Sequence, residues 1–518
     1  MYVYNQDMKN KLLEINQTID KDSIKSHVDQ RPLIIVSNRA PVNFITKKSG
    51  EVVIQRSGGG LVTALLGLAQ NIEATWIAAA INDIERDWGQ RKVDLETKHQ
   101  RIDLKLLPID EETYEKYYSV ISNQLLWFFQ HSMWDLISSP NITRATWEAW
   151  DEGYTKVNQL FADAIIESVK NFSENSIVIL QDYHLYLVPY MIRQILKRQR
   201  LKNRISLAHF IHIPWPGAEE MRILPPRIRN EILRSMTSLD LLGFQTKTDR
   251  VNFYQSVETF LPEASINRRL NHIWRNYHKT KVQNFPISID NKHLLEIANS
   301  EETKKYDKEI KEIKGSSQLI LRVDRSDPIK NIVRGFQAYG DMLEKYPEHI
   351  ENVIFLVILV PSRLGIEEYH SYHDEIMASA GWVNSQYGTR DWDPVYILHG
   401  DNYPRAIAAL KQYDVLLVNS IADGMNLVAK EGVMVNESDG TLILSERVGA
   451  REQLESASLV ISPCDIYATS EALHQALTIP PLERKKNAIH LRSIVETNDI
   501  NKWFSDLITA IKNLGLTI

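Results

Sequence analysis

Residues 423–431 read Asp-Gly-Met-Asn-Leu-Val-Ala-Lys-Glu and come shortly after a short apolar stretch at 415–418. This pattern predicts a buried strand, a turn at Gly424 and a helix that begins close behind the turn. Free N–H groups and the positive end of the helix dipole at such a helix start favour an anion. Asp423 stands before the turn and Glu431 about two helical turns further on. The stretch therefore indicates either an ordinary structural turn or a site for a ligand such as a sugar nucleotide.

Apolar stretches of the same kind recur on both sides of this motif and alternate with longer amphipathic segments. Continuous apolar strands separated by helices imply parallel sheets that are covered on both faces. The strands predicted in the first half are 33–36, 76–80, 177–180, 205–211 and 241–244, and those in the second half are 319–323, 353–360, 395–398, 415–418, 442–444 and 459–461. The sequence therefore predicts an α/β protein with two doubly wound, Rossmann-like domains that face each other across a cleft, where ligands bind beyond the carboxyl ends of the strands.

Four regions follow from this pattern: an N-terminal arm at 1–30, domains at 31–285 and 286–490, and a C-terminal helix within 491–518 that packs back on the domains. The charged stretch 301–314 is typical of a solvated helix. In 501–513, large apolar side chains recur at helical spacing, which favours packing against a domain over partner binding.

Composition excludes several classes of protein. A length of 518 residues suggests two domains of ordinary size, and the net charge of -6 argues against a general nucleic-acid binder. A single cysteine, Cys464, excludes an internal disulfide framework and a multi-cysteine zinc site. No signal peptide and no membrane-spanning run is recognisable, so we expect a cytoplasmic protein without a membrane partner.

Several polar motifs lie at predicted strand ends. Ser37-Asn38-Arg39 follows the first strand, and Gly58-Gly59-Gly60 precedes an expected helix at 61–68, which fits either an anion site or a flexible hairpin loop. Tyr118 and Trp127 belong to an aromatic-rich stretch that is also typical of a core.

Further along the chain, Asp182 follows the third predicted strand and His212 the fourth, although a lone histidine is more often a satisfied structural residue. The segment 322–331, with Arg322 and Lys330, gathers cations and acids; it fits a surface ion cluster or a diphosphate site. Arg363 follows the strand at 353–360 and could meet a second phosphate.

The order of these motifs resembles the trehalose-6-phosphate synthase family, which comprises retaining glycosyltransferases of the GT-B fold, assigned to glycosyltransferase family 20. The resemblance extends from residue 31 to the C-terminal helix. It rests on Ser37-Asn38-Arg39, Tyr117-Tyr118 through Trp127, Asp182-Tyr183-His184-Leu185, His212-Ile213-Pro214, Leu242-Gly243-Phe244-Gln245-Thr246 and 423–431.

The resemblance implies that the second domain binds a nucleotide sugar and the first domain the acceptor. Arg322 and Lys330 would contact the diphosphate, Glu431 the ribose, His212 the donor sugar and Asp182 the sugar substrates. The glucosyl group would lie against Asp423 and the backbone of Gly424, Met425, Asn426, Leu427 and Val428. The implied acceptor site comprises Arg39, Gly59, Gly60, Tyr118, Trp127 and Arg363.

The implied reaction transfers glucose from a nucleotide-glucose, with UDP-glucose as the expected donor, to glucose 6-phosphate with retention, giving trehalose 6-phosphate. The resemblance implies that the leaving phosphate would help to deprotonate the acceptor, so that no carboxylate nucleophile would be required. We expect no metal site and no cofactor. Catalysis would rest on positioning and charge stabilisation. A separate phosphatase would act on the product, because the chain leaves no room for a phosphatase domain. The oligomeric state stays open, a homo-oligomer included.

Three departures from the family pattern leave alternatives open. Seven residues separate Arg322 from Lys330 where four are usual, 78–80 read Ala-Ala-Ala where a second tryptophan is common, and Ser288 replaces a glycine. The alternatives are a pseudo-glycosyltransferase similar to validoxylamine phosphate synthase, a glucosylglycerol-phosphate synthase, and a non-catalytic regulator that binds sugar phosphates. UDP, GDP and ADP donors cannot be told apart at this point.

Overall fold

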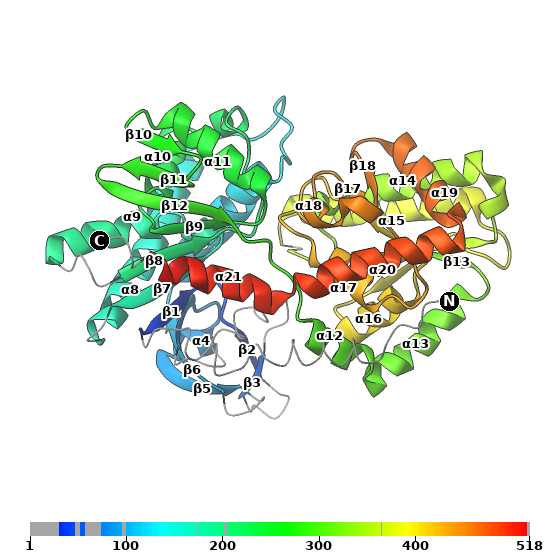
Figure 1. Ribbon diagram of the computed structural model, residues 1–518, viewed down its shortest axis with the longest axis horizontal. Coiled ribbons are helices and arrows are strands. Elements are labelled where there is room, and N and C mark those ends of the chain that lie inside the picture. Colours follow the sequence, from blue (N-terminus) through cyan, green and yellow to red (C-terminus); the bar gives the residue numbers. More distant parts are fainter. Residues whose placement is uncertain are drawn as a thin grey trace.

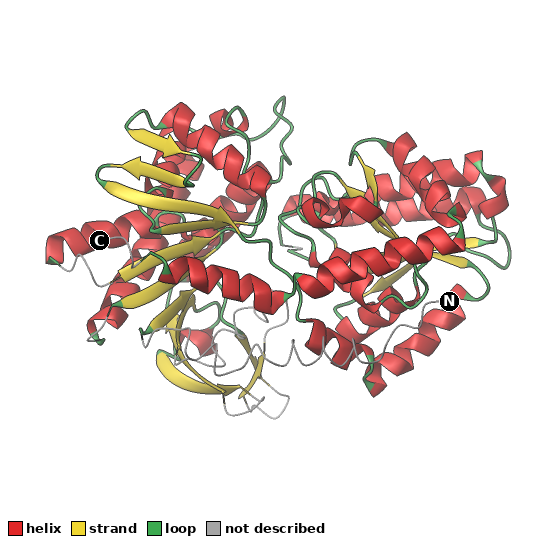
Figure 2. Cartoon of the chain, in the orientation of Figure 1, coloured by secondary structure: helices red, strands yellow, loops and turns green. Residues whose placement is uncertain are grey.

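Two separate twisted sheets, each with helices on both faces, form the framework of the protein in a computed structural model (Figure 1; Figure 2). The structure describes residues 31–46, 52–56, 74–95, 100–172, 175–200, 205–363 and 365–514. The expected α/β class with parallel sheets is confirmed. The predicted arm at 1–30, the helix at 61–68 and the glycines Gly59 and Gly60 lie outside the described residues.

The first sheet has ten strands in the order β10-β11-β12-β9-β8-β7-β1-β4-β6-β5. Its parallel centre contains every strand expected from apolar runs: β1 (Leu33–Val36), β4 (Ala74–Ala79), β7 (Ser176–Gln181), β8 (Ile205–Phe210) and β9 (Leu241–Phe244). The flanking strands were not predicted: β5 (Gln90–Leu95), β6 (Gln100–Leu107), β10 (Ala264–Asn267), β11 (His272–Arg275) and β12 (His278–Asn284). These strands alternate polar and apolar residues or are mostly polar, as expected near a sheet edge. β2 (Val42–Thr46) and β3 (Val52–Arg56) form a separate hairpin.

The second sheet has six parallel strands in the order β15-β14-β13-β16-β17-β18. All six were expected: β13 (Gln318–Arg325), β14 (Val353–Val360), β15 (Val395–His399), β16 (Val415–Val418), β17 (Thr441–Ser445) and β18 (Leu459–Ile461). The strand order reverses between β13 and β16, and such a switch point leaves a crevice at the carboxyl ends of the strands.

The helices of the N-terminal half are α4 (Asp83–Arg86), α5 (Glu111–Glu115), α6 (Phe128–Gln130), α7 (Arg144–Glu148), α8 (Lys156–Lys170), α9 (Val188–Gln199), α10 (Pro226–Met236) and α11 (Lys247–Phe260). Two wider π-helical segments, Lys116–Trp127 and Ala149–Thr155, continue α5 and α7. The helices of the C-terminal half are α12 (Asn291–Ala298), α13 (Glu301–Lys314), α14 (Ile332–Lys345), α15 (Glu367–Tyr387), α16 (Tyr403–Gln412), α17 (Leu427–Val435), α18 (Arg451–Leu454), α19 (Ile466–Thr478), α20 (Pro481–Thr497) and α21 (Ile500–Lys512). Among the described residues, no helix combines the length and the apolar character that crossing a membrane requires.

The chain passes between the two halves after β12, and the last helix crosses back at the same place (Figure 1). In α21, the Trp503 side chain donates to the Phe285 carbonyl at 3.1 Å, and its ring lies edge-on to Phe210 at 5.4 Å. The buried Lys430 donates to the Ile287 carbonyl at 2.6 Å. α21 therefore packs against the connection and the first sheet, as its apolar spacing predicts.

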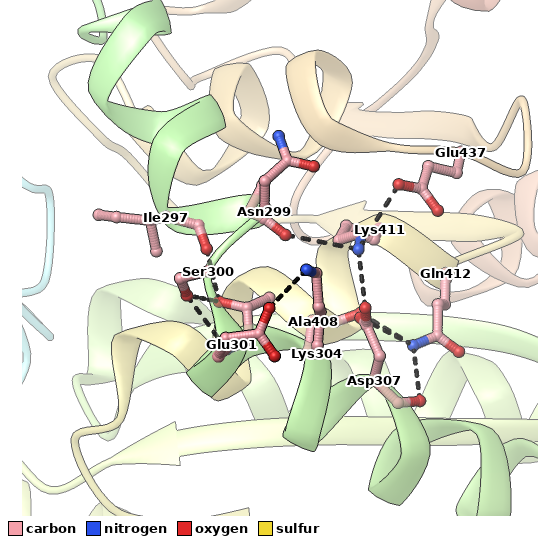
Figure 3. Close-up of polar contacts among 12 residues, drawn as sticks. Ile297, Asn299, Ser300, Glu301, Lys304, Asp307, Ala408, Lys411, Gln412 and Glu437 are labelled. Atoms are coloured by element: carbon pink, nitrogen blue, oxygen red, sulfur yellow. Dashed lines mark hydrogen bonds and ion pairs between the residues drawn. The ribbon is translucent and has the colours of Figure 1, made fainter.

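A polar cluster fixes α12 and α13 to α16 (Figure 3). The Lys411 ammonium donates to the Asp307 carboxylate at 2.7 Å and lies 3.5 Å from Glu437. Gln412 also donates to the Asp307 carbonyl, at 3.2 Å. Lys411 is buried, so these partners compensate for the loss of hydration of its charge. The expected solvated helix at 301–314 is thus anchored through one of its acids.

Candidate active site

A largely buried ion pair lies at the switch point of the second sheet. Lys330, just beyond β13, contacts the Asp423 carboxylate at 2.5 Å and lies 3.7 Å from Asp324. Burial opposes both charges, but each charge stabilises the other: the pKa of Lys330 is raised and that of Asp423 is lowered. Both groups are therefore charged at neutral pH, and they stand at the carboxyl ends of β13 and β16, as the sequence predicts.

The turn at 423–426 presents the start of α17 to the cleft. Asn426 has a positive φ of 66°, caps the helix by accepting from the Ala429 N–H at 3.1 Å, and donates to Asp423 at 3.1 Å. Asp423 is thereby held beside the first N–H groups of α17, which have no acceptor within the helix. A negatively charged or polyol ligand would meet both.

Gly424 brings the two halves of the protein together. A Cβ atom at this position would lie 1.8 Å from the His212 carbonyl oxygen, so only glycine permits the approach. Next to it, the Glu452 carboxylate of α18 accepts from the N–H groups of Lys247 and Thr248 at the start of α11, at 3.1 and 3.2 Å. The strand ends of the first sheet and the start of α17 therefore face each other at short range.

Asp182 and His212 follow neighbouring strands, β7 and β8, on the opposite wall. Asp182 has a strained φ of 68°, and its carboxylate accepts from the His212 N–H at 3.3 Å. Burial raises the pKa of Asp182 to about 7 and lowers that of His212 to about 3. The neutral His212 ring donates from Nε2 to the Gln181 side-chain oxygen at 2.8 Å and accepts at Nδ1 from Gln245 at 3.4 Å. Its ring nitrogens thus have protein partners, and a contact with the donor sugar stays a prediction.

Arg39, Tyr118, Trp127 and Arg363, predicted as the acceptor's phosphate site, come together from both halves. The Arg363 guanidinium lies over the Trp127 ring at 4.4 Å, and the Arg39 guanidinium lies 5.7 Å from the centre of the Tyr118 ring. Burial would raise the pKa of Tyr118, but Arg363 and Arg39 outweigh it and lower the pKa. This corner of the cleft therefore has a positive potential suited to a phosphate.

Glu431 lies one turn into α17 and faces α16. The Tyr403 hydroxyl donates to its carboxylate at 2.9 Å, and burial raises the pKa of Glu431. A ribose hydroxyl would replace the tyrosine as donor to this carboxylate, and the ribose contact stays a prediction.

The assignment of Arg322 to the diphosphate needs correction. Arg322 is completely buried, with 0% of its side chain exposed, and donates to the Lys330 carbonyl at 2.8 Å. Arg325 is the arginine that reaches the cleft: its side chain is 43% exposed and its guanidinium lies 5.9 Å from the centre of the Trp127 ring. Four residues separate Arg325 from Lys330, which is the usual family spacing, so the apparent departure came from counting from the wrong arginine.

Two further residues were not selected from the sequence. Asp327 is fully buried and lies 3.5 Å from Arg325 and 3.8 Å from Arg363, so it links the cations of the donor and acceptor sides. His131 packs on Trp127 with ring centres 4.1 Å apart, and its Nδ1–H donates to the Trp127 carbonyl at 2.8 Å. Burial lowers the pKa of His131 to about 4, so its other nitrogen is a neutral acceptor. The position of Asp327 three residues before Lys330 was the signal in the sequence that could have identified Asp327. No local pattern distinguished His131 from a core residue.

The other two departures from the family pattern lie in the interior. The three alanines at 78–80 are buried at the end of β4, and Ser288 is buried in the connection between the halves. These four side chains therefore have little exposure in the structure, and their effect on the acceptor site stays untested.

Comparisons with known proteins agree with this geometry. A profile of Glycosyltransferase family 20 matches residues 31–513. The 56 kDa subunit of the UDP-forming alpha,alpha-trehalose-phosphate synthase of Kluyveromyces lactis is 33% identical over 97% of this chain and 99% of its own length. A structure described as trehalose-6-phosphate from E. coli bound with UDP-2-fluoro glucose has a TM-score of 0.79 at 28% identity, covering 93% of this chain and 99% of that one.

A second solved structure is the UDP-forming alpha,alpha-trehalose-phosphate synthase of Burkholderia xenovorans in complex with glucose-6-phosphate. It has a TM-score of 0.77 at 25% identity, covering 93% of this chain and 100% of the other. The family profile matches nearly the whole described chain, and most of the described site residues expected from the sequence gather where the two halves meet. This protein therefore belongs to glycosyltransferase family 20.

Proposed function

We propose that this protein is a trehalose-6-phosphate synthase that transfers glucose from UDP-glucose to glucose 6-phosphate, with retention, and releases UDP. The relatives named above support this reading, because they are UDP-forming synthases or carry a UDP-sugar analogue or glucose-6-phosphate. The single observation that carries it is the distribution of charge in the cleft. Arg325 and Lys330 provide one cationic centre and Arg39 and Arg363 a second, which fits two phosphate-bearing substrates side by side.

In the proposed reaction, the bond between the anomeric carbon and the UDP β-phosphate oxygen breaks while the acceptor's anomeric hydroxyl forms the new bond on the same face. The hydroxyl proton passes to the departing phosphate oxygen. Arg325 and Lys330 stabilise the negative charge that develops there. The pKa of Asp182 is raised to about 7, so its carboxyl group can donate a hydrogen bond to a sugar hydroxyl or accept one from it. Asp423 and the N–H groups of α17 orient the glucosyl group.

Two wider expectations belong to the same proposal. The product would be dephosphorylated by a separate phosphatase, and both reactions would take place in the cytoplasm. The proposed site needs no cofactor, because positioning and the four cations provide the required stabilisation.

Product analysis tests the proposal. The purified protein is incubated with glucose 6-phosphate and, in parallel, UDP-, GDP- or ADP-glucose, and the products are identified by mass spectrometry, with Asp423→Asn as the inactive control. A disaccharide monophosphate formed fastest from UDP-glucose supports the proposal. Preference for another donor would correct the nucleotide. Absence of product with any donor, although UDP binds, would refute the acceptor assignment.

A further inference from the structure

A group of metal-ligating side chains lies in the C-terminal half, away from the cleft. His349 ends the short 3₁₀ turn Pro347–His349 that connects α14 to β14, and His474 belongs to α19. Together with Glu348, their ligand atoms lie within 4.8 Å of one another. The cleft stands at the carboxyl ends of the parallel strands, whereas this group precedes β14. A strand of eight residues spans about 26 Å, so the group is remote from the proposed chemistry.

The two imidazoles are arranged as ligands of one ion would be. Nε2 of the buried His349 and Nδ1 of His474 form a hydrogen bond of 2.9 Å, and the rings are inclined at 64°. A bound ion would take the place of the proton that these two nitrogens share. Two nitrogen ligands at about 2.0–2.1 Å from a tetrahedral ion stand roughly 3.3 Å apart. A widening of a few tenths of an ångström would therefore admit an ion.

Neighbouring side chains hold the His474 ring in place. Tyr346 stacks on it with ring centres 3.6 Å apart and planes inclined by 8°. The Tyr346 hydroxyl donates to Glu471 at 3.0 Å, and Lys345 contacts the same carboxylate at 2.6 Å. Supporting contacts of this kind fix a ligand's orientation and lower the cost of ordering it.

We propose that Glu348, His349 and His474 bind one divalent transition-metal ion of the Zn²⁺ class, with water in the fourth position. Two imidazoles and one carboxylate are ligands that Zn²⁺ accepts in tetrahedral geometry. The ion fastens the connection between α14 and β14 to α19, and α14 is the helix that follows Lys330. The two histidines are 125 residues apart and form no local motif, so the amino-acid sequence alone does not reveal this site. This inference does not depend on the proposed function.

Metal titration of the full chain, free of any histidine tag and stripped with a chelator, tests the site. Zn²⁺ binding is measured by calorimetry and thermal unfolding, and Co²⁺ binding by its visible absorption. The variants are Glu348→Gln, which alters an exposed side chain, and His474→Ala; the matched control is His490→Ala, an exposed histidine of α20. Circular dichroism verifies that each variant is folded.

We expect wild type and His490→Ala to bind one Zn²⁺ per chain, to unfold at a higher temperature with Zn²⁺ and to give the absorption of tetrahedral Co²⁺. In Glu348→Gln the affinity should fall, and in His474→Ala saturable binding and the Co²⁺ spectrum should be lost. Absence of saturable binding to wild type would overturn the proposal, as would binding to both site variants with wild-type affinity.

Discussion

Replacing Arg325 by alanine and, separately, Arg322 by methionine discriminates between the two arginines as partners of the donor diphosphate. Arg325 is 43% exposed at the cleft, whereas Arg322 is fully buried beneath it. A hydrogen bond to a charged group contributes about 1.5–3 kcal/mol, so Arg325→Ala should weaken UDP binding by roughly 10- to 150-fold. Arg325 is partly exposed, and the buried Asp327 keeps Arg363 as a partner at 3.8 Å after its loss, so the free energy of unfolding should fall by no more than about 1 kcal/mol.

Arg322→Met should show the reverse pattern. The substitution removes one hydrogen bond to the Lys330 carbonyl, which contributes about 1.5–3 kcal/mol, but it also relieves the burial of a guanidinium, which costs several kcal/mol. Asp324 keeps Lys330 as its partner at 3.7 Å. We therefore expect UDP affinity close to that of wild type and an unfolding temperature that is equal or higher.

The assay is a calorimetric titration of UDP into each variant at one salt concentration, since exposed charges are screened by salt. Thermal unfolding of each variant without ligand separates loss of a contact from loss of structure. Unchanged UDP affinity in Arg325→Ala, together with a large loss in a well-folded Arg322→Met, would refute the reasoning and restore Arg322 as the phosphate ligand.

Four other substitutions test the remaining parts of the site. Arg363→Ala should raise KM for glucose 6-phosphate without altering UDP affinity; an equal effect on both substrates would contradict its role at the acceptor. Glu431→Gln should weaken UDP binding in calorimetry, and unaltered affinity would exclude the ribose contact. Asp182 has a pKa of about 7 in the folded protein and about 3.9 in the unfolded chain, so wild type loses stability as pH rises between these values. The unfolding temperature of Asp182→Asn should therefore exceed that of wild type at pH 8 but not at pH 4. A gain that is independent of pH would contradict the raised pKa. Gly424→Ala places a methyl group against a main-chain oxygen of the facing half and should abolish turnover. The control Gly381→Ala, where no atom lies within 4 Å of the new methyl group, should leave turnover unchanged. Turnover by Gly424→Ala would show that the two halves need not approach this closely.

The second sheet could be predicted completely because all six strands read as apolar runs, and the inner strands β14, β16 and β17 are buried almost throughout. β6 and β12 escaped prediction because their sequences alternate or are polar, and only the pairing with β4 and β9 makes them strands. The predicted strand at 319–323 already argued against Arg322 as the contact to the donor diphosphate. Arg322 lies inside the predicted strand at 319–323, where side chains are covered by helices, whereas Arg325 lies at the carboxyl end of β13.

Contacts between distant segments set the limit of prediction within the site. The approach of Gly424 to His212 and the stacking of Arg363 on Trp127 join residues more than two hundred positions apart, and no local pattern encodes them. Likewise, the role of Asp327 between Arg325 and Arg363 follows only once the strand ends are placed side by side.

The anomeric configuration of the product tests the central claim most directly. UDP-glucose and glucose 6-phosphate are mixed with the purified protein, and the product is followed by NMR as it forms. We expect a 1,1-linked disaccharide phosphate with the α configuration at both anomeric carbons. A β linkage, linkage to another hydroxyl, or free glucose as the sole product would contradict it.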